Sequence, residues 1–172
     1  MSYFKNIFTT GAVSKTPMRV QEAIRRQLPV SPPSRIIELG AGKGELTGIL
    51  LDQYKNTCVK IAAFEINPAF SSDLKKNYPS IQVFTHNALE FAEVTGEPVD
   101  LLICSLPLSF FQRTDRHTLL TSINQQLRPG GKLIILFHAV WLIPQLKRIF
   151  PSATIKWFGH LPPYLLLTYT AN

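Results

Sequence analysis

The sequence predicts an α/β fold in which helices cover both faces of a mainly parallel sheet. Short apolar runs of strand length alternate with segments that carry helix start and stop signals. A glycine-rich turn joins the first run to a helix, as in the βα units that hold nucleotide-like ligands. Only residues 159–163 separate the last two runs. Because that link is too short for a crossover helix, we expect one strand to be reversed.

Capping residues, prolines and glycines place the expected boundaries. Thr16 is expected to cap a helix whose first turn holds Pro17, and Asn67 and Pro68 to open a later one. Pro129-Gly130-Gly131 is expected to turn the chain into its fifth strand. The expected helices are 17–28, 45–54, 68–77, 88–94, 114/115–127 and 141–150, and the expected strands are 35–39, 59–65, 81–85, 99–105, 132–137, 153–158 and 164–170.

The composition predicts one compact domain with a substantial core. The 172 residues are 45% hydrophobic, yet no apolar run is long enough to cross a membrane. The first residues lack the long apolar stretch of a signal peptide. Cys58 and Cys104 each lie in an apolar run and are expected to be buried free thiols in a reducing cytoplasm. The four histidines show no metal-ligand spacing, so no metal is expected.

The positive charge predicts an anionic partner. The net charge of +7 is spread along the chain and suits nucleic acid or a membrane surface with acidic lipids, although a merely basic enzyme is the alternative. Tyr3, Phe4, Ile7 and Phe8 would share one face of a helix beside Lys5, as in a short interfacial helix. The same face could instead pack on the protein's own core.

The glycine turn carries the strongest functional signal. Gly40, Ala41, Gly42 and Gly44 follow a strand, but a dinucleotide-binding turn places its third small residue one position later. Glu38 precedes the turn, and a carboxylate at the ligand mouth disfavours a pyrophosphate and favours a cation. These residues predict a site for S-adenosylmethionine, which carries an ammonium and a sulfonium. An ordinary glycine-rich loop and a nicotinamide site of unusual spacing are the alternatives.

This motif resembles the first motif of class I methyltransferases. The resemblance implies a Rossmann-like sheet of seven strands in the order 3-2-1-4-5-7-6, mainly parallel with one reversed strand. Glu65 ends the second strand, where a carboxylate can accept hydrogen bonds from both ribose hydroxyls. Ile66 follows and could lie on the adenine face. Asn87 and Ala88 end the third strand, where an acidic or amide residue of the resembled family contacts the adenine amino group. The alternative is that Asn87 serves only as the N-cap of the next helix.

The loop after the fourth strand bears on the methyl acceptor. Methyltransferases that modify bases carry an amide, a proline and an aromatic residue here, whereas this chain has Ser105, Leu106, Pro107 and Leu108. Ser105 can still accept a hydrogen bond, but Leu108 offers no stacking surface for a flipped base. Together with Thr10-Gly11-Ala12-Val13, this loop resembles bacterial phospholipid N-methyltransferases, a family similar to ribosomal RNA adenine dimethylases.

The resemblance implies N-methylation of the ethanolamine amine of a phospholipid at the membrane surface. The alternatives are an amine in RNA, in protein or in a small molecule, and a non-catalytic binding module. We expect residues 1–30 to form a helical segment that covers the site and contacts the membrane, and residues 31–172 to form the cofactor-binding core. The protein is expected in the cytoplasm, at the inner membrane face. Catalysis is assigned to Ser105, Leu106, Pro107 and Tyr3, and substrate binding to Leu108, Phe110, Arg113 and Arg116. Ser105 is also expected to contact the cofactor.

Overall fold

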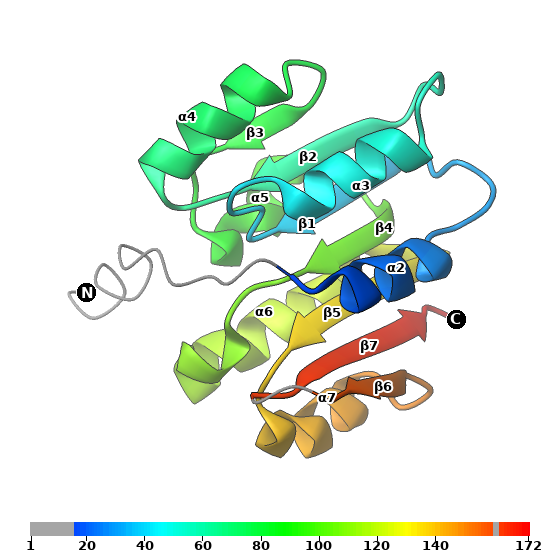
Figure 1. The fold of residues 1–172 in the computed structure, drawn as a ribbon. Coiled ribbons are helices and arrows are strands. Elements are labelled where there is room, and N and C mark those ends of the chain that lie inside the picture. The colour runs from blue at the N-terminus through cyan, green and yellow to red at the C-terminus, as the bar shows by residue number, and fades with distance from the viewer. Residues whose placement is uncertain (1–15, 160–161) are drawn as a thin grey trace.

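The computed structural model describes residues 16–159 and 162–172, so Tyr3 and the expected interfacial helix lie outside the described residues. Seven strands form one sheet in the order β3-β2-β1-β4-β5-β7-β6 (Figure 1). Strand β7 runs antiparallel to β5 and β6, while the other pairs are parallel, which confirms the predicted fold class and strand order. The strands are β1 (Arg35–Leu39), β2 (Lys60–Phe64), β3 (Gln82–Phe84), β4 (Val99–Cys104), β5 (Leu127–Phe137), β6 (Thr154–Phe158) and β7 (Tyr164–Thr170).

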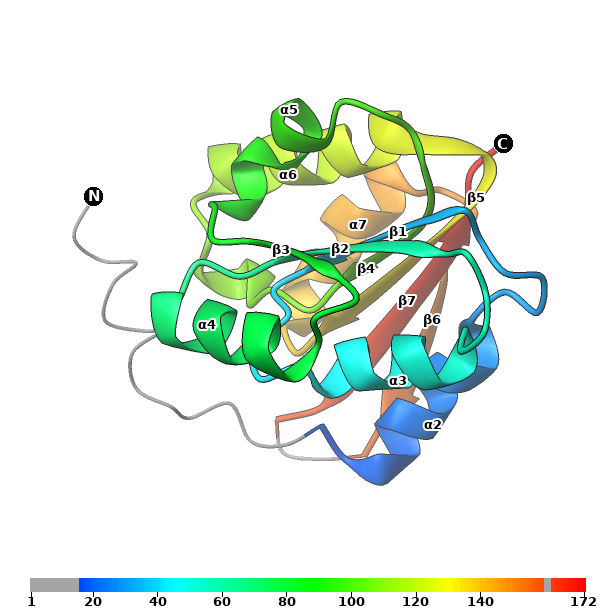
Figure 2. The ribbon, with the colours of Figure 1, turned by 90° about the horizontal axis from the view of Figure 1, so that it is seen from above.

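Helices cover the sheet on both faces. Seen from above, α2, α3 and α4 lie on one side of the strands and α5, α6 and α7 on the other (Figure 2). The helices are α2 (Met18–Gln27), α3 (Glu45–Gln53), α4 (Pro68–Asn77), α5 (Phe91–Thr95), α6 (Arg113–Gln126) and α7 (Ile143–Ile149). Short 3₁₀ turns are η1 (Ala88–Glu90), η2 (Leu108–Phe110) and η3 (Val140–Leu142).

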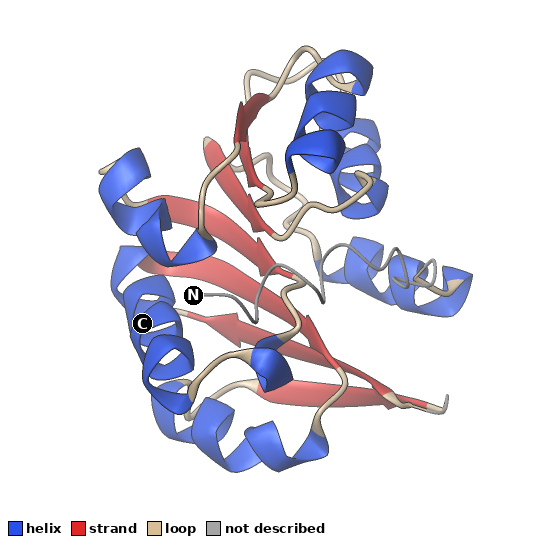
Figure 3. Ribbon diagram, turned by 90° about the vertical axis from the view of Figure 1, so that its left-hand side faces the viewer, coloured by secondary structure: helices blue, strands red, loops and turns tan. Residues whose placement is uncertain are grey.

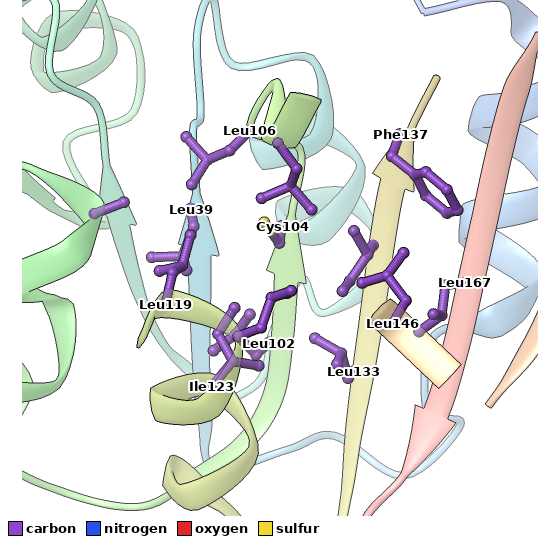
Figure 4. Close-up of a cluster of buried hydrophobic side chains, with 14 of the residues drawn as sticks. Leu39, Leu102, Cys104, Leu106, Leu119, Ile123, Leu133, Phe137, Leu146 and Leu167 are labelled. Carbon is purple, nitrogen blue, oxygen red and sulfur yellow. The ribbon is translucent and has the colours of Figure 1, made fainter. Parts of the chain in front are cut away.

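The alternation of side chains along the central strands builds two hydrophobic layers. Ile36 packs beneath α2 and α3, whereas Ile37 and Leu39 point to the opposite face. Figure 4 shows part of this second layer, in which strand residues such as Leu102 and Leu133 meet Leu119 and Ile123 of α6. Because both faces are buried, the central strands are almost continuously apolar.

The start of α2 differs from the prediction. Pro17, not Thr16, occupies the N-cap position, and no side chain caps the helix. The N–H of Thr16 instead donates to Oε2 of Glu45 at 2.9 Å. This contact is tertiary and could not be inferred from a local capping pattern. It places the beginning of α2 beside the beginning of α3.

Two further expectations are corrected. Cys104 is buried as predicted, but Cys58 is exposed, because it lies in the connection between α3 and β2 rather than within the strand. The segment Pro129-Gly130-Gly131, expected as a turn before the fifth strand, lies inside β5. Leu127 already pairs with β4, and residues 128–131 form an irregularity before the pairing resumes at Lys132.

Candidate active site

The predicted site residues meet at the carboxyl edge of the parallel strands. Gly40, Glu65 and Ser105 follow β1, β2 and β4, whose last residues are paired in register. The N–H of Gly40 donates to the carbonyl of Phe64 at 2.9 Å, and that of Ser105 to the carbonyl of Leu39 at 3.0 Å. Figure 3 looks onto this edge, where loops lie in front of the strands. In open α/β sheets, such an edge is where ligands bind.

The three glycines of the turn share a positive φ but differ in what surrounds them. Gly40, Gly42 and Gly44 all have positive φ, at 81°, 54° and 85°. A Cβ atom on Gly40 would lie 2.8 Å from the Leu106 side chain, and one on Gly44 would collide with the ring of Tyr78. A Cβ on Gly42 would meet nothing within 4 Å. The turn is therefore packed on its first and third glycines and open at its middle one.

Glu38 is wholly buried under this turn. Its Oε2 accepts a hydrogen bond from Oγ1 of Thr47 at 2.6 Å, whereas its Oε1 is buried without a described partner. Burial raises the pKa of the Glu38 carboxyl to about 7; the Thr47 hydrogen bonds oppose this shift and the charge of Glu65 adds to it. A cationic group nearby would stabilise the ionised form.

Glu65 ties the turn to the end of β2. Its Oε2 accepts from the N–H of Gly42 at 2.8 Å, and its Oε1 from the N–H of Asn67 at 2.7 Å. Each carboxylate oxygen can accept a second hydrogen bond. The ribose contact predicted for Glu65 is therefore compatible with these bonds, and the same bonds hold the carboxylate in one orientation.

The residues expected around the adenine are also at this edge. Ile66 is exposed, while Ala41 and Ala88 are buried. Oδ1 of Asn87 accepts from the N–H of Leu89 at 3.0 Å and caps η1. Of the two alternatives for Asn87, capping is present in the structure, and the adenine contact stays a prediction.

The loop after β4 is fastened to the glycine turn. Oγ of Ser105 donates to the carbonyl of Gly40 at 2.7 Å, and the Leu106 side chain packs over the same glycine. Pro107 is half-buried, and Leu108 is buried in the core, with its side chain away from solvent. Ser105 therefore positions the loop, and the substrate contact predicted for Leu108 is not supported by its burial.

Phe110, Arg113 and Arg116, which follow this loop, differ in exposure and in contacts. Phe110 and Arg113 are exposed. Arg116 donates to two backbone carbonyl oxygens in and just after η2, at 3.2 and 3.0 Å, and to Oε1 of Gln145 at 2.8 Å. Its guanidinium thus braces this connection against α7. The phosphodiester contact predicted for Arg116 finds no support in this arrangement, while that of Arg113 stays a prediction.

Two residues of the site were missed from the sequence. Thr47 holds Glu38, and Tyr78 lies over Gly44, whose carbonyl accepts from the Tyr78 hydroxyl at 3.1 Å. A hydroxyl residue in the first turn of the helix after a glycine motif was an available signal for Thr47. Tyr78 follows α4, and only the tertiary fold brings it to the turn.

The site fits S-adenosylmethionine on three observations. The space above Gly42 is open, an oxygen of Glu38 is buried without a described partner, and the Glu65 carboxylate is held at the strand edge. An ammonium suits the first carboxylate and hydroxyls suit the second. Among the described residues no cluster of potential metal ligands is present, and no helix there is long and apolar enough to cross a membrane.

Comparison with known proteins decides the family. Residues 36–131 match the methyltransferase domain family. The chain belongs to this family. This match confirms the class of enzyme and the predicted cofactor, S-adenosylmethionine. The N-methyltransferase NodS from Bradyrhizobium japonicum, solved with S-adenosyl-L-homocysteine, has the same fold, with a TM-score of 0.71 and 19% identity over 89% of this chain and 85% of that one.

Two relatives match this chain over different shares of their lengths. Carboxy-S-adenosyl-L-methionine synthase from Psychrobacter is 33% identical over 59% of this chain, which spans only 39% of that protein. Ornithine lipid N-methyltransferase from Singulisphaera acidiphila is 21% identical, over 94% of this chain and 88% of that protein.

Proposed function

We propose that this methyltransferase transfers a methyl group to the primary amine of a membrane lipid, in the first instance the ethanolamine amine of a phospholipid. The loop after β4 carries the proposal, because the position at which base-modifying relatives present an aromatic residue holds a leucine buried in the core. The likeness to an ornithine lipid N-methyltransferase, over 94% of this chain and 88% of that protein, supports a lipid amine.

The residues of the chain would act by positioning and by electrostatics. S-adenosylmethionine supplies an electrophilic methyl group on a sulfonium. The uncharged nitrogen of the lipid amine would accept this methyl group with its lone pair, S-adenosyl-L-homocysteine would be released, and the proton lost by the methylated nitrogen would go to water. Glu38 and Glu65 would hold the cofactor, while Ser105 keeps the loop after β4 against the turn. The carbonyls of this loop would orient the amine.

The test is transfer of label from methyl-labelled cofactor into liposomes of phosphatidylethanolamine and phosphatidylglycerol. We expect label in mono-, di- or trimethylated lipid, separated by chromatography. Liposomes without an amine lipid, and a Glu65→Ala variant, are the controls and should give no labelled product. If no label appears in the lipid although calorimetry shows that the cofactor still binds, the proposal of a phospholipid acceptor is wrong.

Parallel assays separate the other acceptors. Label only in liposomes that contain ornithine lipid would replace the ethanolamine amine by the ornithine amine. Label in total RNA, with none in lipid, would move the protein to the nucleic-acid alternative, for which its net charge of +7 is also suitable.

A further inference from the structure

The exposed apolar side chains of this protein gather around one edge of the sheet. The large hydrophobic residues that are exposed in the described part are Met18, Val30, Ile66, Phe110, Val140, Trp141 and Trp157. All except Val30 belong to segments at the carboxyl edge, where the candidate active site lies. Val30 follows α2 and precedes β1, at the opposite edge.

Each position follows from the topology. Met18 begins α2, which the bond from Thr16 to Glu45 places beside the start of α3. Phe110 lies in η2 after β4, and Val140 and Trp141 lie in η3 after β5. We call Met18, Phe110, Val140 and Trp141 the apolar rim. Met18 is 79%, Trp141 72% and Phe110 59% exposed, so these side chains are presented to solvent rather than partly buried.

Ile66 and Trp157 lie at the same edge but are not counted in the rim. Ile66 follows β2 on the inner side of the same edge. Trp157 is the residue before the last one of β6. It pairs with Leu165 of β7, which pairs in turn with Phe137 at the carboxyl end of β5. Trp157 therefore lies at the level of the carboxyl ends of the parallel strands.

Three exposed cations lie beside the apolar rim. Arg19, Lys43 and Arg113 are exposed at the carboxyl edge and form no ion pair with a described carboxylate. Acidic side chains lie at this edge as well: Glu45 begins α3, Asp115 lies in the first turn of α6, and Glu90 pairs with His86. The carboxyl edge therefore combines exposed apolar groups with exposed cations, on a chain whose net charge is +7.

We propose that the apolar rim is the face by which this protein docks on an anionic lipid bilayer. Exposed tryptophan and aliphatic side chains suit the boundary between headgroups and acyl chains, and unpaired arginine and lysine suit acidic headgroups. Docked in this way, the mouth of the cofactor site opens against the headgroup layer. Only this consequence for lipid access rests on the proposed function; the docking itself does not.

The rim is less suited to a nucleic acid. Base stacking needs aromatic faces along a strongly basic groove, whereas Met18 and Val140 present aliphatic surface that gains nothing from a base. The four apolar residues of the rim form a surface that water solvates poorly, and the exposed cations beside them suit the acidic headgroups of a bilayer.

The first experiment measures sedimentation of the full chain with vesicles of phosphatidylcholine and phosphatidylglycerol, which contain no amine acceptor. We expect binding that increases with the phosphatidylglycerol fraction. Trp141→Glu and Met18→Glu should each weaken binding roughly tenfold or more, since a carboxylate at the boundary repels the surface and opposes insertion. Arg113→Gln should weaken it about fivefold. Val30→Glu, the matched control at the opposite edge, should bind as the unchanged protein does.

A second readout locates the contact. The chain has two tryptophans, so Trp157→Phe leaves Trp141 as the single fluorophore. We expect brominated lipids to quench its emission in bound protein. The proposal would be overturned if Val30→Glu and Trp141→Glu lost vesicle binding equally. It would also be overturned if brominated lipids did not quench Trp141, or if the protein bound single-stranded RNA but not vesicles.

The outcomes separate this proposal from the proposed function. If the unchanged protein binds vesicles but methylates no lipid, the proposed lipid acceptor is wrong and the proposed docking face stands. If the protein methylates vesicle lipid and Trp141→Glu does not reduce this activity, the proposed docking face is wrong and the proposed lipid acceptor stands. With both correct, Trp141→Glu loses activity on vesicles and keeps it on a short-chain, water-soluble phosphatidylethanolamine.

Discussion

At the scale of single residues, the carboxyl group of Glu38 is the most constrained group of the site. It is wholly buried, only one of its oxygens has a described hydrogen-bond partner, and its pKa is raised to about 7. Burial without a counter-charge disfavours the ionised form. A cofactor with an ammonium would supply that counter-charge, so the site is arranged to be completed by its ligand.

This burial predicts how stability depends on pH in the cofactor-free protein. The Glu38 pKa rises from 4.5 to about 7 on folding, so between these values the unfolded chain loses a proton that the folded protein keeps. The free energy of unfolding should therefore fall by about 3 kcal/mol as pH rises from about 4.5 to 7, and then level off. Denaturation of Glu38→Gln, which stays neutral, should lack this component.

The difference between the two proteins isolates Glu38 from other titrating groups. Parallel stability curves for the unchanged protein and Glu38→Gln would contradict the prediction. The same variant should bind S-adenosylmethionine more weakly above pH 7, where the native carboxylate is charged and attracts the ammonium.

Gly42 allows the open side of the turn to be tested directly. Gly42→Ala meets no protein atom, so its stability should fall by only about 1–2 kcal/mol, from the positive φ. Its methyl group would occupy the space assigned to the cofactor, and calorimetry should show affinity reduced at least tenfold, about 1.4 kcal/mol.

Gly96→Ala is the matched control for this substitution. Gly96 also has a positive φ of 64° and open space around its Cβ position, but it ends α5 away from the site. It should show the same loss of stability with unchanged cofactor affinity. Equal affinities in both variants would mean that the ligand does not approach Gly42.

At the scale of elements, the site depends on the ends of three strands and on the contacts that join their loops. Ser105 bonds to Gly40, and Glu65 bonds to Gly42, so the loops after β1, β2 and β4 form one unit. Nothing in the local sequence of any one loop specifies these partners. They follow from the register of β1 with β2 and β4.

Ser105→Ala tests the positioning role of this serine. Loss of the hydrogen bond to the Gly40 carbonyl should lower the free energy of unfolding by about 1 kcal/mol. Because the loop after β4 is then less well held, methyl transfer should slow as well. Ser152→Ala, in an exposed turn, should change neither quantity. A slower reaction at unchanged stability would instead favour the direct contact with the amine that was predicted for Ser105.

At the scale of the whole molecule, the centre of the sheet is buried, whereas the connection that holds Cys58 is exposed. Cys104 lies at the end of the central strand β4, where burial raises the pKa of its thiol to about 12. Cys58 lies outside the strands and is exposed. Thiolates are the reactive form of cysteine, so the two thiols should differ greatly in reactivity.

A thiol-reactive disulfide reagent should therefore titrate one cysteine rapidly in the native protein and two after denaturation. Cys58→Ser should abolish the rapid reaction, and Cys104→Ser should leave it unchanged. Two rapid thiols in the native state would mean that the centre of the sheet opens readily to solvent.

Much of the architecture could be predicted because its signals are local. The glycine turn, Asn67 as a cap and the short link before the last strand indicate an α/β sheet with one reversed strand, and the resemblance to class I methyltransferases implies its strand order; the structure confirms both. The errors arose where tertiary contacts decide. Thr16 bonds to Glu45 instead of capping its helix, and Cys58, expected to be buried in an apolar run, is exposed just before β2.

The sequence by itself determined the fold class, the family and the cofactor, because apolar periodicity and a glycine motif act through short-range backbone geometry. Only the tertiary structure decided what the side chains do. Leu108 and Arg116, expected at the substrate, are used within the protein itself, and Thr47 and Tyr78 joined the site from other elements. The apolar rim is likewise a product of topology, since parallel strands bring residues distant in sequence to one edge.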